Sequence, residues 1–128
     1  MRNRTLLYVL VLAACLCGCQ KEEKKKNVLM IRVANRSTVE MKDVTLRFAG
    51  PQTVWYGDVA PGAATNYYQV NSAYSTTYAE AVINGEEAVC QPIDHIGESL
   101  LSSGNYTYAL RYEPSATDKR GRLLLELE

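Results

Sequence analysis

From residue 29 onward, apolar and polar side chains alternate along the chain in short runs. The run that starts at Leu29 places an apolar side chain at every second position, and the run over 44–48 does the same. A period of two puts successive side chains on opposite faces of a β-sheet. Each run therefore predicts a strand with one buried face. The stretches with this pattern are 29–34, 44–48, 53–59, 65–70, 77–83, 88–93, 106–112 and 122–127.

Turn residues separate these stretches. Asn84-Gly85 predicts a tight hairpin, because both central positions of a type I′ turn need positive φ. Pro61-Gly62 and Pro114 end other strands, and 94–103 is the least strand-like segment. No stretch has a sustained apolar period of 3.6, so we expect an all-β domain. About seven short antiparallel strands favour a two-layer β-sandwich over a small barrel.

The first residues follow a different pattern. Two arginines lie within Met1–Arg4, and a run of fourteen residues without a charge extends from Thr5 to Gly18. A helix that spans a bilayer needs about 20 apolar residues. The run is therefore too short for a membrane span, and it is typical of a cleaved bacterial signal peptide.

Two cysteines compete for lipid attachment at the end of this run. The sequence from Leu12 to Cys15 resembles the lipobox of bacterial lipoproteins at every position, whereas the sequence from Leu16 to Cys19 has an unusual cysteine at its second position. Cleavage before Cys15 would leave two unpaired thiols in an oxidising compartment. We therefore favour residues 1–18 as the signal peptide and Cys19 as the lipid anchor, with Cys15 as the alternative.

The residues after Cys19 indicate where the anchor lies. Residues 20–26 contain four lysines and two glutamates but no apolar residue, so 19–26 is expected to be a lipid-anchored, solvated linker. Gln20–Glu23 resembles the export signal that sends lipoproteins of Bacteroidota to the outer face of the outer membrane. The resemblance implies an outer-membrane lipoprotein that is exposed at the cell surface.

Residues 27–128 form the predicted domain. These 102 residues contain eight basic and twelve acidic side chains, which gives a net charge of −4. Nucleic-acid binding requires clustered Lys and Arg, so this charge excludes it. The length is sufficient for one hydrophobic core, and we expect a single domain.

One segment of the domain resembles immunoglobulin-like and fibronectin type III sandwiches. Residues 100–108 resemble the corner before their sixth strand, where a tyrosine hydroxyl bonds back to the preceding loop. The resemblance assigns this structural role to Tyr106. The turn at 58–62 is similar to one between strands of such sandwiches. The chain departs from antibody domains because Cys90 is the only cysteine of the domain and Trp55 has no cysteine partner.

Residues able to carry out chemistry are scarce. His95 is the only histidine, and its neighbours Asp94 and Ser99 share one short segment, which does not suit a catalytic triad. The donors are too few for a tetrahedral zinc site, and no calcium loop is present. Cys90 lies among apolar neighbours without a nearby cation and is expected to be an inert core residue. We therefore expect no enzyme activity, cofactor or metal.

Aromatic residues are the main candidates for binding. Trp55, Tyr56, Tyr67 and Tyr68 can form an exposed patch, and tyrosine and tryptophan are enriched at interfaces. The alternative is that these side chains fill sheet faces, because aromatic residues favour strands.

The sequence thus predicts a membrane-anchored module that binds an envelope protein or a glycan. The alternative is a structural accessory subunit of an envelope complex without a recognition site.

Overall fold

The computed structural model describes residues 28–92, 97–114 and 123–128. The predicted signal peptide, both candidate anchor cysteines, the linker and His95 lie outside the described residues. The described part contains eight strands: β1 (Leu29–Asn35), β2 (Met41–Phe48), β3 (Gln52–Val59), β4 (Tyr68–Val70), β5 (Tyr78–Ile83), β6 (Glu86–Cys90), β7 (Gly104–Tyr112) and β8 (Leu123–Leu127).

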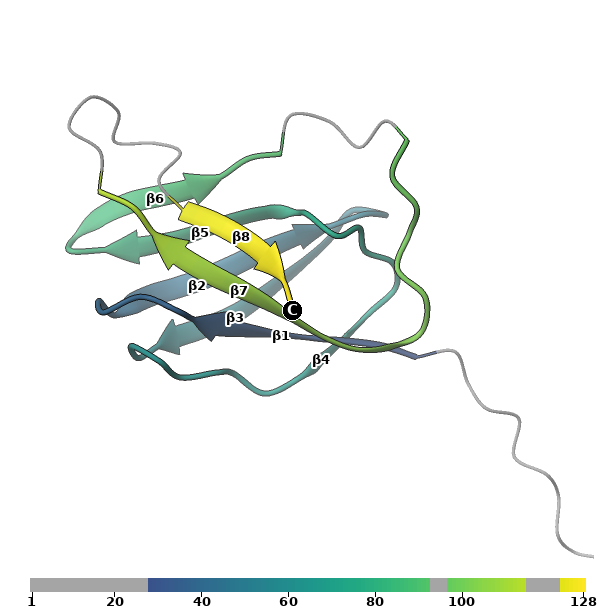
Figure 1. Ribbon diagram of the computed structural model, residues 1–128, viewed down its shortest axis with the longest axis horizontal. Helices are drawn as coiled ribbons and strands as arrows, with labels where there is room; N and C mark the ends of the chain where they lie inside the picture. Colours follow the sequence, from purple (N-terminus) through teal and green to yellow (C-terminus); the bar gives the residue numbers. More distant parts are fainter. Residues whose placement is uncertain (1–27, 93–96, 115–122) are drawn as a thin grey trace, which may run out of the picture.

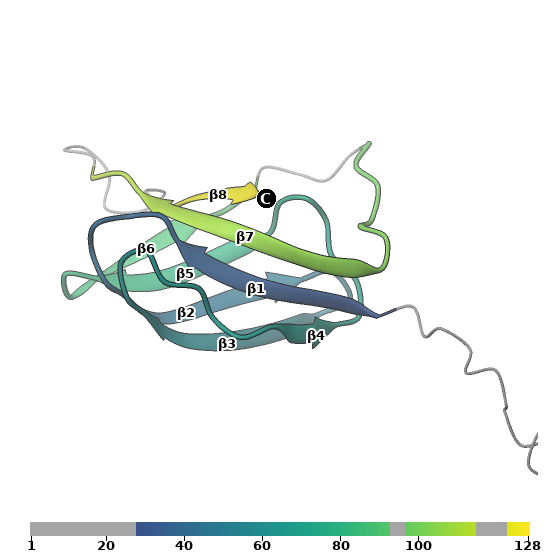
Figure 2. The same ribbon diagram turned by 60° about the horizontal axis from the view of Figure 1, so that its bottom comes forward.

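The strands form two four-stranded sheets, ordered β4-β1-β7-β8 and β3-β2-β5-β6. The sheets pack as two layers, with β1, β4 and β7 in front of β2, β3 and β5 in Figure 2. The predicted all-β sandwich is therefore confirmed, with eight strands in the described residues. Within these ranges no helix is long and apolar enough to cross a membrane.

The strand order differs from that of constant-type immunoglobulin domains. In those domains the first, second, fourth and fifth strands share a sheet. Here β1 and β2 lie in different sheets, and β1 pairs with β7 in parallel, from Leu29 opposite Gly104 to Asn35 opposite Leu110. The remaining strand pairs are antiparallel. The predicted antiparallel sandwich therefore includes one parallel pair among the described strands, β1 with β7.

Several strand boundaries differ from the sequence prediction, and two of the differences have an identifiable reason. The strand predicted at 65–70 is reduced to β4, because the Thr65 hydroxyl accepts a hydrogen bond from the Val33 amide at 3.0 Å and interrupts the ladder. β6 begins earlier than predicted and ends at Cys90, before Pro92. Proline lacks the amide that a further ladder bond requires.

The turns match the sequence prediction. Asn84 and Gly85 have φ values of 52° and 75°, and they join β5 to β6 as a two-residue hairpin. At the predicted Pro61-Gly62 turn, Gly62 has a φ of 75° and the Ala63 amide donates to the Ala60 carbonyl at 3.0 Å.

The core lies between the two sheets and is made mainly of aliphatic side chains. Tyr108 is its largest fully buried residue and stacks on Phe48 with ring centroids 6.0 Å apart. Its hydroxyl donates to the Tyr74 carbonyl. Burial raises the pKa of the Tyr108 hydroxyl, which is consistent with a neutral phenol in the core.

Asn35 is a fully buried polar residue at the end of β1. Its side-chain amide donates to the carbonyls of Val39 and Val59, at 2.8 and 3.0 Å, and its side-chain oxygen accepts from the Ser37 amide at 2.9 Å. The side chain thereby joins the β1–β2 loop to the last residue of β3. This arrangement fixes the end of the sheet that carries the candidate site.

Candidate interaction surface

The four aromatic residues of the predicted patch lie in different environments. On β3, Trp55 points outward and is 62% exposed, whereas Tyr56 points into the sandwich and is 7% exposed. The Tyr56 hydroxyl donates to the Ile31 carbonyl of the opposite sheet at 3.1 Å. Burial raises the pKa of Tyr56. The prediction that Tyr56 belongs to an exposed patch is wrong, because neighbouring residues of a strand face opposite sides of the sheet.

The two adjacent tyrosines are separated in the same way. Tyr67 lies against the guanidinium of Arg32, 4.9 Å from the ring centroid, on the sheet that contains β1. Tyr68 is 42% exposed, and its ring meets the Tyr56 ring edge-on at 5.1 Å. A single patch of these four residues does not form, and only Trp55 remains as an exposed aromatic residue on the outer face of the β3-β2-β5-β6 sheet.

Trp55 is held in a defined orientation. Gly57 has a φ of 85°, and a Cβ atom at that position would lie 3.5 Å from the Trp55 ring, so the indole lies over the Gly57 backbone. The indole nitrogen donates to Oδ1 of Asp43 at 3.3 Å. A large apolar side chain that is both exposed and oriented binds with little loss of conformational entropy.

The Asp43 side chain is placed by a β-bulge in β2. The register shifts on both sides of Val44, and Asp43 has a φ of 51°, which is uncommon for a residue other than glycine. The Asp43 amide donates to Oδ1 of Asp58 at 3.0 Å, and the Asp43 carbonyl accepts from the Thr45 hydroxyl at 3.1 Å. Sequence analysis missed Asp43; the only signal was the break in alternation at the start of this strand.

The centre of the same face carries a second aromatic and acidic cluster. Thr45 pairs with both Trp55 and Glu80, so these three residues form one row across the sheet. The Tyr78 hydroxyl donates to Oε2 of Glu80 at 3.0 Å, and Arg47 lies 4.4 Å above the Tyr78 ring and 4.0 Å from Glu80. Burial and the bond to Glu80 raise the pKa of Tyr78.

A shallow depression of about 230 Å³ lies beside Trp55 on this surface. Asp43 contributes to both features, because its carboxylate holds the indole and also lines the depression. The walls of the depression are formed by Asp43, Thr45, Glu80, Ala81, Val82 and Glu87. We call the surface made by Trp55, Asp43, Thr45, Glu80 and Glu87 the Trp55 face.

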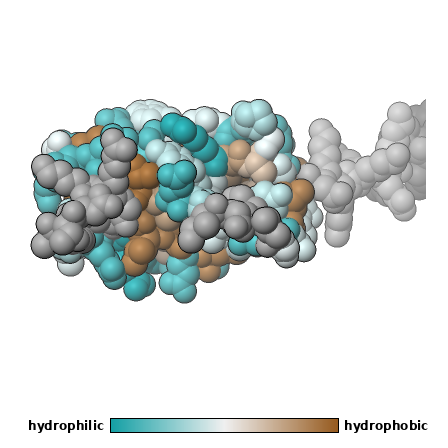
Figure 3. Space-filling view, turned by 90° about the horizontal axis from the view of Figure 1, so that it is seen from above, coloured by the Kyte–Doolittle hydropathy of each residue, from teal (hydrophilic) through white to brown (hydrophobic). Residues whose placement is uncertain are grey.

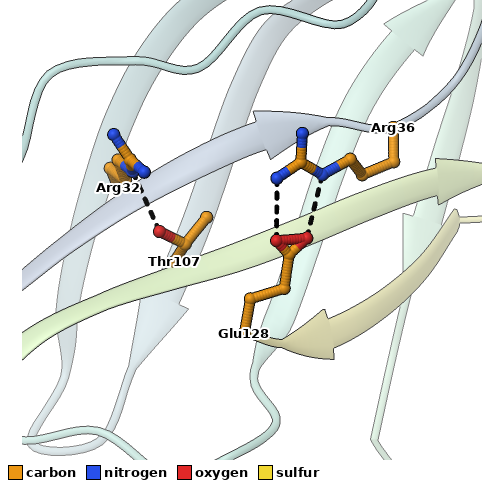
Figure 4. A network of polar contacts seen from close by, with 4 residues as sticks. All are labelled: Arg32, Arg36, Thr107 and Glu128. Atoms are coloured by element: carbon orange, nitrogen blue, oxygen red, sulfur yellow. Dashed lines mark hydrogen bonds and ion pairs between the residues drawn. The ribbon is translucent and has the colours of Figure 1, made fainter.

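The outer face of the other sheet is organised around arginines that have internal partners. Arg32 donates to the Thr107 hydroxyl at 2.9 Å, and Arg36 makes two hydrogen bonds of 2.8 Å to the Glu128 carboxylate (Figure 4). Hydrogen bonding from Arg36 lowers the pKa of Glu128. These contacts join β1 to β7 and the residue after β1 to Glu128, and both guanidinium groups therefore have partners within the protein.

Tyr106 makes the contact that the sequence predicts. Its hydroxyl donates to the Ser102 carbonyl at 2.9 Å, four residues upstream. Residues 97–103 belong to the connection that leads from β6 in one sheet to β7 in the other. The bond fixes the start of β7 and gives Tyr106 a structural role.

Cys90 is half-buried at the side of the sandwich where β6 and β8 approach each other. Figure 3 looks onto this side and shows hydrophobic residues between hydrophilic ones. Burial raises the pKa of the Cys90 thiol. Among the described residues no group of His, Cys, Asp and Glu is arranged to hold a metal ion.

The fold and the Trp55 face define a small β-sandwich with an exposed aromatic and acidic sheet surface. No protein-family model and no curated protein sequence matches the chain. The chain is similar in structure to a protein from Eubacterium rectale that was solved by NMR, with a TM-score of 0.56 and 8% sequence identity. The similarity covers 82% of this chain and 94% of the other. At this identity the likeness concerns the fold alone.

Proposed function

We propose that this protein is a lipid-anchored, non-catalytic interaction module of a bacterial cell envelope that binds a protein partner through the Trp55 face. The anchor is Cys19, with Cys15 as the alternative, and the membrane is the outer membrane. Support for the anchor comes from the N-terminal arginines, the short apolar run and the cysteine that follows it.

The observation that carries the binding role is the exposure of Trp55. A tryptophan that is 62% exposed leaves a large apolar surface in water, and it is held over Gly57 and by Asp43 rather than folded into the core. Tryptophan is enriched among the residues that dominate binding energies at interfaces. One oriented tryptophan with polar side chains around it resembles the centre and rim of a protein interface.

Co-purification of the full chain from gently solubilised membranes tests the binding role. We expect Trp55→Ala to lose a specific envelope protein that the wild-type chain retains. Leu124→Ala is the matched control, because Leu124 is also a large exposed hydrophobic residue, 44% exposed, but lies on β8 of the other sheet. Equal recovery of the partner with both variants would contradict a role for the Trp55 face.

Metabolic labelling with a palmitate analogue tests the anchor separately. We expect Cys19→Ser to abolish labelling of the full chain and Cys15→Ser to preserve it. Labelling confined to Cys15 would move the anchor to the alternative position. Labelling that survives both substitutions would remove the lipoprotein proposal while leaving the binding experiment unaffected.

A further inference from the structure

The Trp55 face is acidic. Asp43, Glu80 and Glu87 line the depression beside Trp55, and Asp58 contacts the backbone of Asp43. Lys42 and Arg47 are the basic residues of β2. Each already has an acidic neighbour, since Lys42 lies 3.9 Å from Glu40 and Arg47 lies 4.0 Å from Glu80. Acidic side chains therefore outnumber basic ones around Trp55, and the surface attracts a positively charged ligand.

The same sheet already contains a site that binds a guanidinium group, that of Arg47. Arg47 lies above the Tyr78 ring at 4.4 Å, while Glu80 accepts a bond from the Tyr78 hydroxyl and lies next to the guanidinium. Arg32 and Tyr67 repeat the aromatic part of this arrangement on the other sheet, at 4.9 Å. A planar guanidinium stacks well on aromatic rings, and a nearby carboxylate balances its charge.

Trp55 has a carboxylate beside its ring, as Tyr78 does, but among the described residues no arginine lies over the ring. Its indole nitrogen is bonded to the Asp43 carboxylate, and one side of its ring lies over Gly57. In the part of the chain that the structure describes, the arginines that lie over aromatic rings are Arg32 and Arg47, and neither lies over Trp55. Tryptophan is the best aromatic partner for a cation.

We infer that the Trp55 face receives an arginine side chain that projects from a basic surface of the protein partner, with the guanidinium stacked on Trp55 beside the carboxylates of Asp43, Glu80 and Glu87. The inference rests on the proposed function and specifies the chemistry of the partner. A neutral sugar can also stack on an indole, but it carries no positive charge to pair with the carboxylates. The charge of the surface therefore favours the cation.

Peptide titrations of the full chain test this inference directly. The chain contains one tryptophan, so its fluorescence reports on Trp55 alone. The protein is kept in a polyoxyethylene detergent, which has no sugar headgroup, at low ionic strength. We expect hexa-arginine to change the Trp55 emission saturably, and hexa-citrulline, which has nearly the same shape without the charge, to leave it unchanged. Added salt should weaken the response.

Substitutions separate a specific site from general attraction between charges. Asp43→Asn keeps the shape of the residue and tolerates its positive φ, because asparagine adopts this conformation readily. We expect it to weaken binding of a dye-labelled hexa-arginine, measured by anisotropy, about two- to fivefold. Trp55→Leu should weaken binding by a similar factor. Glu126→Gln makes the same charge change at an exposed position of β8 in the other sheet and should have no effect.

Three results would overturn the inference. One is an unchanged Trp55 emission at peptide concentrations that saturate the anisotropy signal, and another is equal weakening by Asp43→Asn and Glu126→Gln. The third is a response to maltohexaose without a response to hexa-arginine, which would make the ligand a glycan. Loss of the co-purified partner on Trp55→Ala would still support the proposed function in the first two cases, so failure of the inference and failure of the function are distinguishable.

Discussion

Replacement of Asn35 tests whether a single buried amide holds one end of the sandwich together. Its side chain is fully buried and makes three hydrogen bonds, to the carbonyls of Val39 and Val59 and to the Ser37 amide. Asn35→Ala removes all three bonds and leaves their backbone partners without them. At about 1 kcal/mol net for each bond, the free energy of unfolding should fall by about 3 kcal/mol. This is a large part of the roughly 5–15 kcal/mol that stabilises a domain.

Asn35→Asp makes the test more specific, because it replaces the side-chain NH2 group with an oxygen and keeps the shape of the side chain. The aspartate can still accept from Ser37, but at neutral pH it places a carboxylate against the carbonyls of Val39 and Val59, where Asn35 donates in the native protein. Burial and these carbonyls should raise the pKa of the carboxyl group in the folded state above its unfolded value. The folded state then binds the proton more tightly, so the variant should gain stability relative to Asn35→Ala as the pH falls.

Urea denaturation of both variants at pH 7 and pH 5 measures these differences. We expect Asn35→Asp to be the less stable variant at pH 7 and to approach or exceed Asn35→Ala at pH 5. A loss below about 1 kcal/mol for Asn35→Ala would show that the three bonds contribute little net stability. A pH-independent difference between the two variants would show that the aspartate is not buried in the folded state.

Three further predictions concern other side chains. Tyr56→Phe removes one buried bond to Ile31 and should lower the free energy of unfolding by about 1 kcal/mol in urea denaturation, whereas no change would indicate that the bond is not maintained in solution. Glu128→Gln should reduce stability slightly at neutral pH. Because Arg36 lowers the pKa of Glu128, this difference should vanish as the pH falls through that lowered pKa, and a difference that grows in acid would contradict the pairing. Cys90 should react with a maleimide more slowly in the folded chain than in urea, as measured by mass spectrometry of its peptide, since burial raises the thiol pKa; equal rates would refute this.

The local features of the fold were predictable from the sequence because they depend on neighbouring residues. Alternation of apolar side chains located the eight strands, and Asn84-Gly85 identified the β5–β6 hairpin because few residues accept two successive positive φ values. Tyr106 was assigned its bond to the preceding loop from a resemblance over a short segment, and the structure contains that bond. In each case the interaction spans only a few residues.

The tertiary structure alone decided which strands pair and which side chains meet. The parallel pairing of β1 with β7 joins segments that are 75 residues apart, and no local pattern encodes it. The sequence predicted Trp55 and Tyr56 in one exposed patch, whereas they lie on opposite faces of β3, and Tyr56 is buried because it packs against the second sheet, where its hydroxyl bonds to the Ile31 carbonyl. The bulge at Asp43 likewise depends on contacts with β3. The candidate site is formed by cross-strand contacts, and these exist only after the chain has folded.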